Sequence, residues 1–138
     1  MSYKFKFEGK EYDLNEEKLV GFFNDEENEI LGIDENKIFE MLNNSTEVDF
    51  EKTYYKEVCE NCLAGKEENK KVFDYLEYYF YVYSKDGNYV ASNISNEYDG
   101  LSFTRLERQK IVDTSYIVTI TVCAHCGEFT IEIEKFEL

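Results

Sequence analysis

The sequence lacks several features that mark common classes of protein. It contains no proline and no tryptophan, and its only histidine is His125. One histidine without a Ser-His-Asp pattern gives little support to nucleophilic catalysis. The N-terminal residues contain no long apolar segment, and no later run approaches the 18 apolar residues of a membrane-spanning helix. We therefore expect a cytoplasmic protein with no membrane partner.

Positive charge is also scarce. The 138 residues include 15 lysines and arginines against 30 aspartates and glutamates, which gives a formal net charge of -15. A surface of this charge repels nucleic acid and anionic membranes. We expect no nucleic-acid partner, and the charge favours another protein, possibly a basic one. The 12 tyrosines and 11 phenylalanines argue against disorder, and the length fits a single domain over residues 1–138.

The four cysteines form two CxxC pairs, Cys59 with Cys62 and Cys123 with Cys126. In a reducing compartment such pairs bind metal more often than they form disulfides. Two thiolates on each of two tight turns match the tetrahedral geometry of Zn²⁺. The sequence thus predicts one structural zinc ion bound by all four cysteines. Such a closed site has no open position for chemistry, so we expect a non-enzymatic protein.

Cys123, Cys126 and Gly127 resemble the metal-binding knuckle of zinc ribbons and rubredoxins. The first pair departs from that pattern, because its glycine is delayed to Gly65. The resemblance implies one metal ion held between the two knuckles, with only the four cysteines carried over as ligands. Elsewhere the chain looks like a small acidic bacterial domain, and the expected role is a protein-interaction module.

The alternative is a redox or electron-transfer protein that uses the CxxC pairs or a rubredoxin-like iron centre. A thioredoxin-type dithiol needs its first cysteine at a helix N-terminus, whereas Cys123 is expected between two strands. The environment of Cys59 is open in this respect. His125 is expected to face solvent, since four cysteines already complete a tetrahedron.

The hydrophobic pattern predicts an α+β fold. It consists mainly of an antiparallel sheet, with two short N-terminal helices and a zinc-ribbon-like hairpin near the C-terminus. The first helix is expected over residues 15–23, and the second begins after Asp34 with Ile38, Met41 and Leu42 facing inward. Strands are expected over residues 3–8, 47–58, 72–83, 89–94, 101–106 and 115–122, and from residue 129 onward.

Two further segments carry interpretations. The acidic run 25–29 lacks the glycine and glutamate that a calcium loop requires, so it is expected to be a solvated loop. The aromatic run Tyr75–Tyr83 is apolar on both faces of a strand, which predicts that both faces are covered. Whether its tyrosines belong to the core or to a partner-facing surface is left open, with the core favoured.

Overall fold

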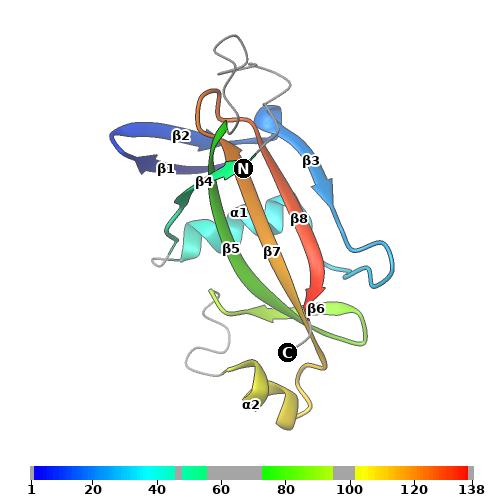
Figure 1. The fold of residues 1–138 in the computed structure, drawn as a ribbon. Helices are drawn as coiled ribbons and strands as arrows, with labels where there is room; N and C mark the ends of the chain where they lie inside the picture. Colours follow the sequence, from blue (N-terminus) through cyan, green and yellow to red (C-terminus); the bar gives the residue numbers. More distant parts are fainter. Residues whose placement is uncertain (1, 46–47, 56–72, 95–101, 137–138) are drawn as a thin grey trace.

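The computed structural model describes residues 2–45, 48–55, 73–94 and 102–136. Within these ranges the chain forms eight strands and two α-helices (Figure 1). The strands are β1 (Tyr3–Phe7), β2 (Lys10–Leu14), β3 (Leu19–Phe23), β4 (Glu51–Tyr55), β5 (Phe73–Lys85), β6 (Asn88–Ser92), β7 (Thr114–Cys123) and β8 (Phe129–Phe136). The helices are α1 (Glu35–Asn44) and α2 (Phe103–Arg108). The fold is mainly β, so the α+β class predicted from the sequence is wrong.

Six of the strands form one sheet in the order β3-β8-β7-β5-β4, with β6 paired to β5. The long central pair β5 and β7 is antiparallel from Tyr75 opposite Cys123 to Ser84 opposite Thr114. The β-branched run in β7 favours this central position. The other pairs in the sheet are also antiparallel, as the sequence predicted, except that β3 runs parallel to β8. Strands β1 and β2 form a separate hairpin.

The turn between β5 and β6 is a tight hairpin turn with an Asp-Gly pair at its centre. Asp86 and Gly87 have φ angles of 53° and 82°, the positive values that a tight turn of this kind requires. The β1–β2 hairpin closes with the same backbone conformation, because Glu8 and Gly9 also have positive φ angles. Both turns therefore follow from local sequence.

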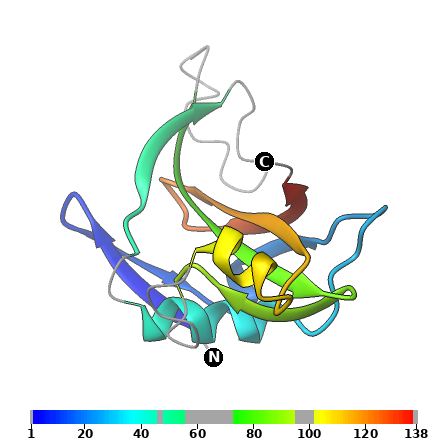
Figure 2. The same cartoon turned by 90° about the horizontal axis from the view of Figure 1, so that it is seen from below.

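One face of the sheet is covered by α1 and by the β1–β2 hairpin (Figure 2). Asp34 caps α1 by accepting a hydrogen bond from the Lys37 amide at 2.8 Å, and this confirms the predicted second helix. Its buried face includes Phe39, whose ring meets that of Phe129 in β8 edge-on at 6.1 Å. The hairpin adds Phe5, which stacks on Phe50 at 4.1 Å.

The helix predicted over residues 15–23 is absent. Asn15 caps only a short 3-10 turn over Glu16–Lys18, and β3 follows it directly. The apolar spacing of Leu19 and Phe22 suits a helix, yet here both side chains pack against the core from a strand. Pairing with β8 satisfies the backbone of this segment and so overrides the helical pattern.

The strand predicted over residues 101–106 is replaced, over its described part, by α2. Ser102 caps this helix by accepting a hydrogen bond from the Arg105 amide at 3.3 Å. Leu106 is buried in a small second core with Tyr83, Ala91 and Val112. Among the described residues, neither helix has the length and apolar character that a membrane crossing requires.

Candidate metal centre

The second CxxC pair lies in the turn that joins β7 to β8. Cys123 ends β7 and is buried, and Cys126 is half-buried three residues later. The Gly127 amide donates to the Cys123 carbonyl at 3.0 Å, and the Cys123 amide donates to the Glu128 carbonyl at 2.8 Å. The turn over residues 123–127, which we call the second knuckle, therefore lies between two antiparallel strands.

Gly127 gives this turn its shape. Its φ angle is 82°, in the left-handed region that side chains with a Cβ rarely adopt. A Cβ at this position would lie 3.8 Å from the nearest atom, the Nζ of Lys18, which is ordinary contact. Backbone conformation, not lack of space, is therefore the reason for glycine.

The first pair, Cys59 and Cys62, lies outside the described residues. The four-cysteine site therefore stays a prediction. Within the described ranges, no three or more histidine, cysteine, aspartate or glutamate side chains are grouped closely enough to hold a metal ion.

Two residues of β2 donate hydrogen bonds to backbone carbonyls of the second knuckle. The Nζ of Lys10 donates to the Ala124 carbonyl at 3.1 Å and to the His125 carbonyl at 2.6 Å. The hydroxyl of Tyr12 donates to the Ala124 carbonyl at 2.7 Å. Lys10 also lies 5.2 Å from the centre of the Tyr12 ring, which suits a cation–π contact. The two side chains thus form one unit against the turn.

A third contact comes from the 3-10 turn. The Nζ of Lys18 donates to the Cys126 carbonyl at 2.9 Å. Three successive carbonyls of the knuckle, those of Ala124, His125 and Cys126, are therefore held by N-terminal side chains. We call Lys10, Tyr12 and Lys18 the clasp.

The clasp places two positive charges beside the cysteine turn. Cations beside a zinc tetrathiolate would offset part of its negative charge. Burial raises the pKa of Tyr12, and the neighbouring Cys123 and Glu8 raise it further. Tyr12 therefore keeps its proton as a hydrogen-bond donor. The arrangement suits a turn that carries negative sulfur ligands.

The remaining features of the turn bear on catalysis. The side chain of His125 is exposed, as the sequence predicted, and only its carbonyl takes part in the contacts above. Cys123 ends a strand and is followed by a turn, so it lacks the helix N-terminus that activates thioredoxin-type thiols.

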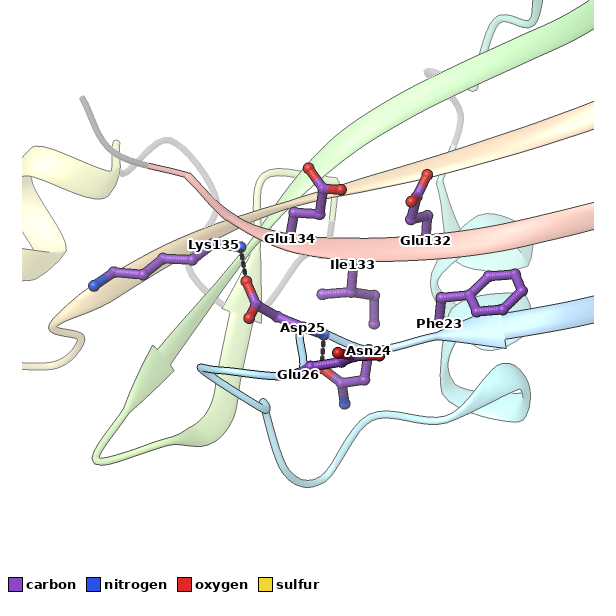
Figure 3. Close-up of a pocket in the computed structure, with 8 residues that line it drawn as sticks. All are labelled: Phe23, Asn24, Asp25, Glu26, Glu132, Ile133, Glu134 and Lys135. Carbon is purple, nitrogen blue, oxygen red and sulfur yellow. Dashed lines mark hydrogen bonds between the residues drawn. The ribbon is translucent and has the colours of Figure 1, made fainter.

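A second feature is a hollow of about 420 Å³ between the residues after β3 and the end of β8 (Figure 3). Asp25 lines it and accepts hydrogen bonds from the amides of Glu27, Asn28 and Lys135, each at 2.9 Å. The bonds from Lys135 and Asn28 outweigh desolvation and lower the pKa of Asp25. This carboxylate is used to tie an exposed loop to the sheet, which confirms the solvated loop predicted for residues 25–29.

Sequence reasoning found the knuckle and missed the clasp. Residues 10–14 were not predicted as a strand, so Lys10 and Tyr12 had no assigned direction. Their spacing of two residues, which places both on one face of a strand, is the only local signal. Nothing local indicates that this face meets a turn more than a hundred residues away.

Comparison with known proteins gives one match. A family model with the description of a protein of unknown function matches residues 3–138, nearly the whole chain. No curated protein and no solved structure matches the sequence.

Proposed function

Because the chain belongs to the family described as protein of unknown function DUF3785, its role must be inferred from its own residues, and we propose that it is a non-enzymatic, zinc-stabilised domain that binds another protein. Cys59, Cys62, Cys123 and Cys126 would hold the ion. Zinc in such a site supplies structural stability, because four protein ligands leave no position for a substrate.

The observation that carries this proposal is the clasp on the second knuckle. The three successive carbonyls of this turn are held by Lys10, Tyr12 and Lys18, so protein contacts fix the backbone that carries the cysteines. Fixed ligands cost less conformational entropy on binding. Groups that hold metal-ligating residues in position contribute strongly to metal affinity. The two ammonium groups also favour a dianionic centre over a neutral one.

The protein-binding role is supported by charge and by exposed rings. The chain has a net charge of -15, which opposes nucleic acid as a partner. Phe23 and Tyr79 are more than half exposed, and large exposed rings are common on interaction surfaces.

We expect one zinc ion per chain in protein purified without a metal-binding tag. Elemental analysis and zinc-edge absorption spectroscopy give the stoichiometry and the number of sulfur ligands. Four sulfur neighbours at about 2.3 Å are expected. Less than about a third of a zinc per chain after expression with ample zinc, or a red iron-loaded protein, would refute the zinc centre.

Removing the charges of the clasp should weaken zinc binding. In the double variant Lys10→Met/Lys18→Met, we expect zinc affinity, measured by competition with a chelator, to fall by about tenfold or more. Methionine keeps much of the side-chain volume, so the loss reports the lost hydrogen bonds and charges.

Lys6→Met and Lys4→Met together are the matched control, because both lysines are exposed in the same hairpin. This control should change affinity by less than about twofold. An equal loss in both double variants would show that only the net charge of this N-terminal part of the chain matters, and the clasp would then have no specific role.

A further inference from the structure

The six-stranded sheet has a second face, opposite to the one covered by α1. At one end of this face, Tyr83 is buried under α2. Farther along the strands, one row of directly paired residues crosses the sheet on this side. Tyr79 of β5 pairs with Thr119 of β7, Thr119 with Glu132 of β8, and Glu132 with Phe23 of β3. The two rings at the ends of the row are 54% and 55% exposed.

The ring of Phe23 is held in place on this face. It lies over Gly21, where an added Cβ would approach the ring to 2.5 Å. Because Gly21 has no side chain, the Phe23 ring packs directly against the backbone at this position. Tyr79 is oriented in a similar way by Tyr81, since the two rings meet edge-on at 6.3 Å. Both exposed rings thus have defined positions.

Carboxylates lie between the rings. Glu132 and Glu134 project from the same side of β8, while Ile133 points to the opposite side (Figure 3). On β5, Glu77 accepts a hydrogen bond from the hydroxyl of Tyr55 in β4. Burial raises the pKa of Tyr55, the Glu77 bond and charge raise it further, and the charge of Glu132 adds to this effect. Tyr55 is therefore affected by the charges of carboxylates on two strands, Glu77 of β5 and Glu132 of β8.

We call Phe23, Tyr55, Glu77, Tyr79, Glu132 and Glu134 the aromatic–acidic face. The strand register shows which described residues lie on this side of the sheet. They include no lysine or arginine in β3, β4, β7 and β8, or in the part of β5 that ends at Tyr81. Lys135 is the neighbour of Glu134, and its side chain extends away from the two glutamates (Figure 3). This side of the sheet therefore presents negative charge between exposed rings.

We propose that the aromatic–acidic face binds a basic segment of another protein, with lysine or arginine side chains placed between Tyr79 and Phe23. Each lysine or arginine side chain of such a segment would meet one of the two rings or the nearest of the carboxylates Glu77, Glu132 and Glu134. A nucleic acid or an acidic peptide would face repulsion from the same carboxylates. This inference rests on the protein-binding part of the proposed function and names the chemical class of the partner.

The probe is a fluorescein-labelled arginine-rich peptide, followed by fluorescence anisotropy at physiological ionic strength. A glutamate-rich peptide of equal length is the control for the label. Saturable binding of the arginine-rich peptide is expected, and none of the glutamate-rich one. Failure of the wild-type protein to bind the arginine-rich peptide would overturn the proposal.

Two variants then separate a defined face from general attraction to an acidic protein. Glu77→Gln/Glu132→Gln/Glu134→Gln should weaken binding by at least about tenfold. The control Glu16→Gln/Glu17→Gln/Glu107→Gln removes the same charge at exposed positions elsewhere, and a loss of less than about threefold is expected. Equal losses in the two triple variants would overturn the proposal, because they would indicate binding to net charge alone.

The double variant Phe23→Ser/Tyr79→Ser tests the rings at constant charge, and we expect a loss of about fivefold or more. Unchanged affinity here would remove the rings from the site and overturn the proposal as stated. Zinc content measured on the same samples keeps the two proposals distinct. Zinc-loaded protein without peptide binding refutes the docking face alone, whereas peptide binding at this face by zinc-free protein refutes the metal centre alone.

Discussion

Replacing Cys123 and Cys126 together by alanine should abolish zinc binding and lower the free energy of unfolding by about 4 kcal/mol. The metal would close a loop of about sixty residues between the two CxxC pairs, and closing a loop of that length restricts the unfolded chain by this amount. Denaturant unfolding monitored by tyrosine fluorescence, with zinc measured in parallel, checks both parts of the result.

The pair Cys59→Ala/Cys62→Ala provides the test that both knuckles share one ion. Two remaining thiolates hold zinc far more weakly than four, so either double variant should lose the whole crosslink. The quadruple variant should then be little less stable than each double variant. If the two losses instead add up in the quadruple variant, the pairs do not share a metal.

Replacing Phe39 by alanine should lower the free energy of unfolding by about 3–5 kcal/mol. Its side chain is fully buried between α1 and the sheet, and its ring contacts that of Phe129. Truncation leaves a cavity that the surrounding strands cannot fill, because the core is closely packed. Urea unfolding at equilibrium provides the measurement.

Tyr54→Ala is the matched control for this result. Tyr54 is 56% exposed, so removing its ring should cost less than about 1 kcal/mol. A loss below about 1 kcal/mol in Phe39→Ala as well would mean that α1 does not cover the sheet. The predicted second helix would then have no packing role.

The two N-terminal segments show where sequence pattern was sufficient and where it was not. Asp34 is a strong cap, and residues 35–44 contain a helical stripe without glycine, so local and tertiary preferences agree on α1. Residues 15–23 have similar apolar spacing but also contain Gly21. Their strand is formed by pairing with β8, a partner that no local signal in residues 15–23 identifies.

In the aromatic strand β5 as well, the sequence pattern predicted some features and not others. Leu76, Phe80 and Val82 are buried, as alternation predicted. Among the described residues, α2 covers the second face at Tyr83, whereas Tyr79 is exposed. The position of α2 depends on how the chain returns to the sheet, and the sequence pattern carries no information about that path.

For the candidate site, the sequence identified the turn from Cys123 to Gly127 and the strands on either side. It did not identify the clasp, because Lys10 and Lys18 are ordinary surface residues by pattern. Their role depends on contacts between segments 108 to 115 residues apart. Such pairing is a property of topology, and it is accessible only once the sheet order is known.

The parallel pairing of β3 with β8 also determines when the protein can complete its fold during synthesis. The Asp25 carboxylate and its partner amide in β8 are 110 residues apart in the chain. At ordinary translation rates, β3 leaves the ribosome roughly 5–20 s before its partner strand exists. During that interval the apolar residues Leu19–Phe23 have no partner strand, and unpaired apolar segments are prone to associate with other chains. The protein therefore depends on its β8 residues to end its exposure to aggregation, and a ribosome that stalls before Phe129 leaves that exposure in place.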